Sequence, residues 1–135
     1  MNAAPAALDP QTARQFVADA HGDLDSVRAL LDEDPALVNA AWDWGGSDWE
    51  TGLGAAAHMG RRDIALFLLE RGARLDLFAA AMLGEVEVVR TVLAAFPSQR
   101  DVAGPHGIPL VEHARAGGEE ARAVLELLES EKVRA

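Results

Sequence analysis

The side chains best suited to chemistry lie close together in one segment, residues 41–50, AWDWGGSDWE. It holds all three tryptophans of the chain and three carboxylates. Indole rings supply large, stiff contact area, so tryptophan is enriched at binding hot spots. A neighbouring carboxylate could receive a lysine, an arginine or a ligand amine, and a ring face would add cation–π attraction. The segment therefore predicts a binding site for a protein or peptide partner, and its carboxylates favour a basic one. The residues expected to contact it are Trp42, Asp43, Trp44, Asp48, Trp49, Glu50, His58 and His106.

Four histidines are further candidates for metal or acid–base chemistry. His21 and His58 stand one and two residues before a turn glycine, a place that indicates a structural role such as bonding a helix-end carbonyl. His113 lies in an expected helix beside Glu112. No His-x-x-x-His or His-Glu-x-x-His pattern is present. Neighbouring helices could still bring His58 near the carboxylates of residues 41–50, but we expect no metal ligand and no cofactor.

The sequence offers little for covalent or acid–base catalysis. There are no cysteines, which excludes thiolate catalysis and disulfides. No serine stands in a nucleophile-elbow motif and no glycine loop matches a phosphate cradle. Paired carboxylates would need a closed pocket to shift their pKa values. We therefore expect a protein that is not an enzyme. The competing interpretation is a small-molecule or metal-dependent enzyme with its pocket between residues 41–50 and the side chains of His58 and His106.

Composition narrows the class of protein. A chain of 135 residues, half of them hydrophobic, is long enough for one domain with a real core. Its net charge of −10 disfavours nucleic acid and anionic membranes as partners. The first ten residues lack the basic and apolar regions of a secretory signal, and no apolar run approaches the length of a membrane span. We expect a cytoplasmic monomer.

The elements that must position these residues are pairs of short helices. Thr51 can cap a helix that ends at Gly60, and a second helix follows from Arg62 until Gly72 ends it. The same pattern recurs along the chain and predicts one domain over residues 9–135 after a flexible tail over residues 1–8. The expected repeats cover approximately residues 10–38, 51–74, 76–96 and 108–130. Asp9, Asp23 and Asp76 are the predicted caps of other helices.

Residues 51–60, TGLGAAAHMG, resemble the ankyrin-repeat signature T-P-L-H-x-A-A-x-x-G, and residues 68–76, LLERGARLD, resemble the segment that follows it. Residues 108–110 are similar to the start of this signature in the fourth repeat. The resemblance implies an all-α ankyrin-repeat solenoid of about four helix-turn-helix repeats with irregular finger loops. Gly52 and Gly54 depart from it, because they replace the proline and the histidine of the signature. The spacing departs as well: the second-to-third junction is too short for a finger, and the first is enlarged by residues 41–50.

In ankyrin proteins the inner helices and finger tips line a concave binding surface. The resemblance therefore implies a non-catalytic protein- or peptide-binding module that uses this face and the Trp-rich finger, residues 41–50. Two alternatives stay open. The tryptophans could only cover core exposed where the next finger is missing, or the protein could be an assembly or regulatory subunit that docks through the finger-less third repeat near residues 77–82.

Overall fold

The computed structural model describes residues 4–134, and the side chains among them up to residue 130. This part of the chain is mainly helical, as predicted, with one small sheet. Its α-helices are α1 (Pro10–Asp19), α2 (Leu24–Glu33), α3 (Gly52–His58), α4 (Arg62–Glu70), α5 (Leu77–Leu83), α6 (Val86–Ala95), α7 (Leu110–Ala116) and α8 (Arg122–Arg134). Short 3-10 helices are η1 (Pro35–Asn39), η2 (Pro97–Asp101), η3 (Pro105–Gly107) and η4 (Gly118–Ala121). The strands are β1 (Ala41–Asp43) and β2 (Trp49–Thr51).

The predicted caps begin the helices. Asp9, Asp23, Thr51 and Asp76 each accept a hydrogen bond from the backbone N–H three residues on, which satisfies one of the unpaired donors of the first turn. Pro10 occupies the first turn of α1, where its missing N–H costs nothing. The positions at which these helices begin therefore follow from residues at the start of each helix.

The turns between paired helices explain two of the glycines. Gly60 and Gly84 have φ values of 67° and 81°, in the left-handed region that other residues avoid. A Cβ atom at Gly60 would also collide with the carbonyl oxygen of Ala116, and one at Gly84 with that of Glu120. Residues of α7 and η4, in the fourth helix pair, thus approach both turns so closely that a side chain at either glycine would collide with them.

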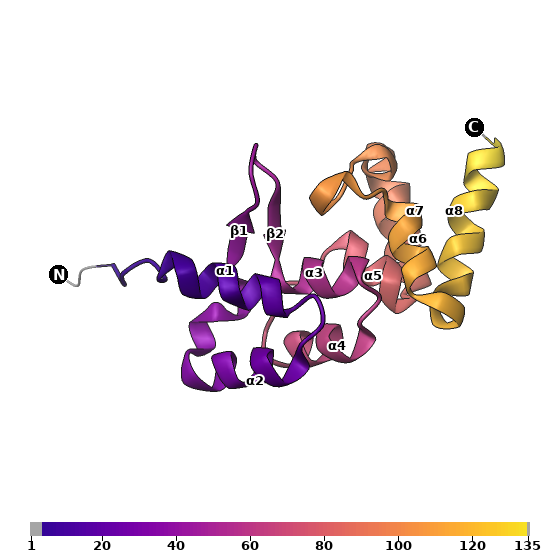
Figure 1. The fold of residues 1–135 in the computed structure, drawn as a ribbon. Coiled ribbons are helices and arrows are strands. Elements are labelled where there is room, and N and C mark those ends of the chain that lie inside the picture. Colours follow the sequence, from indigo (N-terminus) through magenta and orange to yellow (C-terminus); the bar gives the residue numbers. More distant parts are fainter. Residues whose placement is uncertain (1–3, 135) are drawn as a thin grey trace.

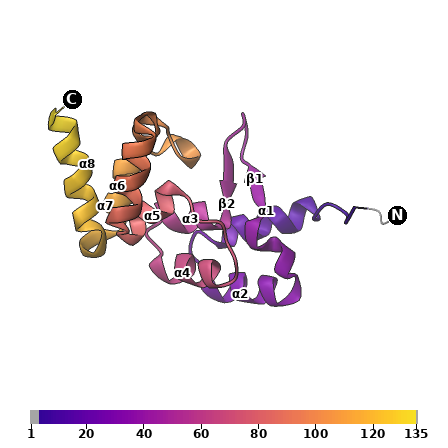
Figure 2. The same ribbon diagram turned by 180° about the vertical axis from the view of Figure 1, so that it is seen from behind.

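The helix pairs stand side by side along the molecule. Helices α1, α3, α5 and α7 contact one another in sequence order, with α2 against α4 and α6 against α8 (Figure 1). The hairpin β1–β2 and the segment before α7 project from the same side of this row, as the reverse view also shows (Figure 2). The core has two clusters that meet at α5: an N-terminal one around Phe16, Leu53 and Leu68, and a C-terminal one around Val89 and Leu110.

The two unusual junctions differ from each other. Segment 41–50, expected as an irregular finger loop within an all-α chain, forms the antiparallel hairpin β1–β2 instead. Between α4 and α5 no strand occurs in the described chain, and residues 71–76 connect the helices directly, as the short spacing predicted. Asn39 spans both junctions, because its side chain donates to the Gly72 carbonyl and accepts from the Arg74 N–H.

The structure describes only part of the tail predicted over residues 1–8. Of the tail predicted over residues 1–8, residues 1–3 lie outside the described residues. Residues 4–8 have no regular secondary structure, but Leu8 packs against the N-terminal core cluster. Among the helices of the described residues, none combines the length and the apolar character that crossing a bilayer requires.

Candidate functional site

The hairpin that carries the tryptophans is held by its own turn. Its register pairs Trp42 with Glu50 and Asp43 with Trp49. At the tip, the Asp43 carboxylate accepts hydrogen bonds from the backbone N–H groups of Gly45 and Asp48, both at 2.9 Å. Directly paired side chains share a face of a sheet, so Glu50 lies on one face and Trp49 on the other. One face of the hairpin therefore carries a carboxylate, and the other carries a large apolar ring.

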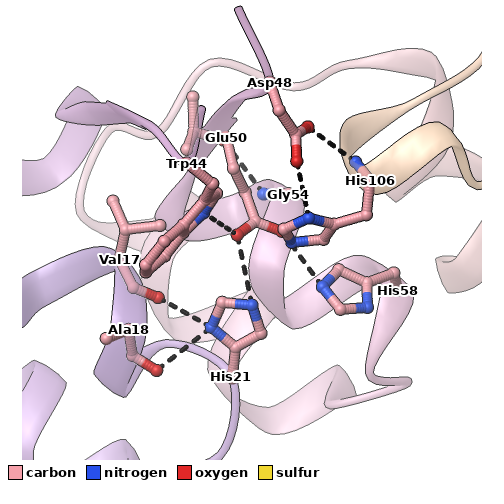
Figure 3. Close-up of polar contacts among 10 residues, drawn as sticks. Val17, Ala18, His21, Trp44, Asp48, Glu50, Gly54, His58 and His106 are labelled. Atoms are coloured by element: carbon pink, nitrogen blue, oxygen red, sulfur yellow. Dashed lines mark hydrogen bonds and ion pairs between the residues drawn. The ribbon is translucent and has the colours of Figure 1, made fainter. Parts of the chain in front are cut away.

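The inner face buries a carboxylate among three imidazoles (Figure 3). Glu50 is fully buried, and its Oε1 accepts a 2.8 Å hydrogen bond from the indole Nε1–H of Trp44. His21 Nε2 lies 3.1 Å from the same oxygen. On the other oxygen, His58 Nε2 lies 3.0 Å and His106 Nε2 3.2 Å from Oε2. We call Glu50, His21, His58 and His106 the Glu50 cluster.

Each of two imidazoles is fixed through its other nitrogen. His21 Nδ1 donates towards the carbonyl oxygens of Val17 and Ala18, at 3.0 and 3.1 Å, which confirms its predicted bond to the helix end. His106 Nδ1 lies 2.8 Å from Asp48 Oδ2, and the other oxygen of Asp48 accepts the backbone N–H of His106 at 2.7 Å. His106 has a φ of 62°, an uncommon conformation for a residue with a side chain, and Asp48 holds it there.

Neighbouring groups shift the pKa values of Glu50 and His21. Burial alone would raise the pKa of Glu50, but the contacts with His21, His58 and Trp44 outweigh it and hold that pKa well below its ordinary value. The Glu50 carboxylate raises the pKa of His21, although burial works against this. Glu50 is therefore an anion at neutral pH, and protonated His21 is favoured beside it.

Two atoms of the cluster are left without a hydrogen-bond partner. Glu50 Oε2 and His58 Nε2 are buried and only 3.0 Å apart, yet neither takes part in a hydrogen bond. The ligand atoms of all four cluster residues lie within 4.8 Å of one another. In the described part of the chain, this is the group of side chains that could hold a metal ion.

An apolar groove with a volume of about 450 Å³ lies between the hairpin and the start of α1. Its walls are the start of α1, with Pro10 and Ala13, and the hairpin, with Trp42, Asp43 and Trp49. Trp49 is 58% exposed, which is unusual for the largest apolar side chain. The groove thus offers a rigid aromatic wall and one carboxylate to a ligand. A second cavity, of about 380 Å³, lies between η2, α7 and α8, away from the predicted residues.

The structure divides the predicted binding residues between these two places. Trp42, Asp43 and Trp49 line the groove. Trp44, His58 and His106 instead contact Glu50, and Asp48 contacts His106. Glu50 cannot touch a partner directly, because it is fully buried.

Sequence reasoning did not place His21 in the site. It occupies the position equivalent to His58 in the preceding repeat, and that equivalence is the signal that could have joined the two. Pro10 and Ala13 were also not predicted as groove residues, because nothing local indicates that the first helix lies beside the hairpin.

Comparison with protein-family models gives no match, and comparison with curated proteins gives none either. The likeness to ankyrin repeats therefore rests on residues of this chain.

Proposed function

We propose that the protein is a non-catalytic binding module of ankyrin type that holds an extended, apolar and basic peptide segment in the groove beside its hairpin. The ankyrin interpretation draws on the signature at residues 51–60 and on the row of helix pairs with a projecting hairpin. The observation that carries the proposal is Trp49, exposed to 58% above an apolar groove of about 450 Å³.

The chemistry of the groove selects the occupant. Its volume falls in the range of ligand-binding clefts, and its apolar walls favour an aliphatic or aromatic side chain. Asp43 adds a negative charge to the wall, and the whole chain carries a net charge of −10. Such a field steers a lysine- or arginine-containing segment towards the groove and repels an acidic one.

The two competing functions have less support. An enzyme centred on Glu50 would need a carboxylate whose pKa lies near the working pH, whereas the contacts with His21, His58 and Trp44 keep this pKa low. Docking through the third repeat would need exposed apolar side chains near residues 77–82. There, residues 79–82 are buried, and the exposed apolar neighbour is Leu75, at 48%.

A selection from a library of displayed random decapeptides tests the proposal. We expect the native chain to enrich peptides in which an aliphatic or aromatic residue is flanked by lysine or arginine. For an enriched peptide, Trp49→Ala should weaken binding by about 2 kcal/mol or more, the loss typical of a hot-spot aromatic. Isothermal titration calorimetry measures it.

The matched control is Phe96→Ala, which removes another aromatic ring that is 65% exposed and lies outside the groove. It should leave peptide affinity unchanged. Failure to enrich any peptide, enrichment of acidic peptides, or an equal loss of affinity in both variants would contradict the proposal.

A further inference from the structure

We propose that the Glu50 cluster binds one divalent transition-metal ion, with zinc as the fitting metal. The ligands are Nε2 of His21, His58 and His106 and one carboxylate oxygen of Glu50, Oε2 being the oxygen that the Trp44 indole leaves free (Figure 3). The sequence predicted no metal ligand because no short motif groups these residues. The fold groups them from four separate segments.

The first argument is distance. Ligands about 2.0–2.1 Å from a tetrahedral zinc ion stand about 3.3 Å from one another. The three imidazole Nε2 atoms lie 3.0–3.2 Å from the nearest carboxylate oxygen of Glu50. No pair in the set is more than 4.8 Å apart, so modest side-chain rotation completes the coordination sphere.

The second argument is which nitrogen carries a proton. A metal-binding histidine usually donates its other ring N–H to a carbonyl or a carboxylate, which leaves a lone pair on the nitrogen facing the metal. His21 Nδ1 faces the Val17 and Ala18 carbonyls, and His106 Nδ1 faces Asp48. Two of the three imidazoles are therefore already oriented with Nε2 directed into the cluster.

The third argument is the pair of buried atoms without a hydrogen-bond partner. His58 Nε2 and Glu50 Oε2 approach to 3.0 Å but are not aligned as donor and acceptor. A buried polar atom without a partner is costly, and native proteins rarely leave one unexplained. A cation bound to both atoms would satisfy them together.

The ligand set selects the class of metal. Imidazole-rich sites suit zinc and its neighbours, whereas calcium and magnesium prefer oxygen ligands alone. Four protein ligands also close a tetrahedral sphere, which is typical of structural zinc rather than of a catalytic ion with an open position. The ion would therefore hold the molecule together without taking part in a reaction.

The ion would join segments that lie far apart in the sequence. His21 follows α1, Glu50 belongs to β2, His58 ends α3, and His106 lies in η3 before α7. Binding would fix the hairpin against both the first helix pair and the loop of the fourth. This inference does not depend on peptide binding, and its test uses no peptide.

The experiment titrates zinc ions into the full chain after removal of metal with a chelator. We expect one equivalent to bind, measured by competition with a chromophoric chelator. At free zinc about 100 times Kd, the ratio of folded to unfolded protein should rise about 100-fold, measured by urea unfolding. Cobalt in place of zinc should give the intense visible absorption of a tetrahedral site.

Single-residue variants distinguish a specific zinc site from nonspecific zinc binding. His106→Gln, in an exposed loop, should weaken zinc affinity by more than about 100-fold, and Asp48→Asn, a positioning change, by about 10- to 100-fold. His113→Gln removes the one histidine outside the cluster and should leave affinity unchanged. The proposal fails if the native chain shows no saturable zinc binding, or if His106→Gln binds as tightly as His113→Gln does. Peptide selection could succeed in either case.

Discussion

Among the residues whose side chains the structure describes, two ionisable ones are buried, in very different surroundings. Glu50 in the N-terminal half is 1% exposed and is surrounded by three imidazoles and an indole N–H. His113 in the C-terminal half is 0% exposed, and its ring packs 4.8 Å from that of Phe78. Glu50 is thus surrounded by polar groups, whereas His113 packs against an apolar ring.

The difference shows in the direction of the histidine pKa shifts. Burial lowers the pKa of His113, and the hydrogen bond between its Nδ1 and the Pro109 carbonyl offsets this only partly. The Glu50 carboxylate instead raises the pKa of His21. Burial by itself favours the neutral ring, and a buried carboxylate within contact distance reverses the preference. The surroundings of Glu50 thus favour a positive charge, a proton or a metal ion, that the surroundings of His113 disfavour.

The largest effect should come from neutralising the centre of the N-terminal half. Glu50→Gln keeps the shape of the side chain but leaves the imidazoles around an uncharged amide. Breaking a buried charge pair costs about 3 kcal/mol or more of unfolding free energy. Urea unfolding in chelator, near neutral pH, measures the loss.

Glu119→Gln provides the control, because Glu119 pairs with Arg122 on the surface at 3.4 Å. An exposed pair of this kind contributes at most about 1 kcal/mol. If the two variants lose equal unfolding free energy, Glu50 contributes no more to stability than a surface charge. That result would contradict the contrast drawn between the surroundings of Glu50 and those of His113.

An intermediate effect is expected from the pH response of His113. Its pKa is lowered in the folded protein, so below about pH 6.5 the unfolded chain binds more protons than the folded one. Stability should therefore fall with decreasing pH until the folded pKa is reached, by at most about 1.4 kcal/mol per pH unit. His113→Gln should remove this slope in urea unfolding measured with chelator between about pH 5 and 7.5. An unchanged slope would show that His113 is not the group responsible.

The smallest effect is the opposite slope expected from His21, which is 26% exposed and so partly screened by solvent. Its raised pKa means that the folded protein binds the extra proton above about pH 6.5. The stabilisation is complete below that pH and is lost as pH rises through the folded pKa. In chelator, the stability difference between the native chain and His21→Gln should therefore shrink with rising pH. A difference that grows instead would reverse our assignment of charge in the cluster.

Local features of the fold were predictable because each depends on neighbours in sequence. The caps at Asp9, Asp23, Thr51 and Asp76 follow from side chains that bond backbone groups three residues away. The absence of a finger between α4 and α5 followed from the spacing of glycines. The hairpin was predicted only as a finger with a glycine turn, because strand pairing depends on a register that three-residue strands barely encode.

The candidate site was predictable in part. The tryptophans and carboxylates of residues 41–50 were identified by their residue types, yet their division between a groove and a buried centre was not. Strand alternation separates Trp49 from Glu50, which are adjacent in sequence but lie on opposite faces. His21 was recognised only as a helix-end residue, although its second nitrogen contacts Glu50.

The sequence by itself determined where helices start and turn, because capping, glycine conformation and apolar spacing act over a few residues. The tertiary structure alone decided that His21, Glu50, His58 and His106 would meet, since 85 residues of chain separate the first from the last. Such a meeting depends on how successive helix pairs pack and on the register of one short hairpin. Those are long-range contacts, and no local pattern encodes them.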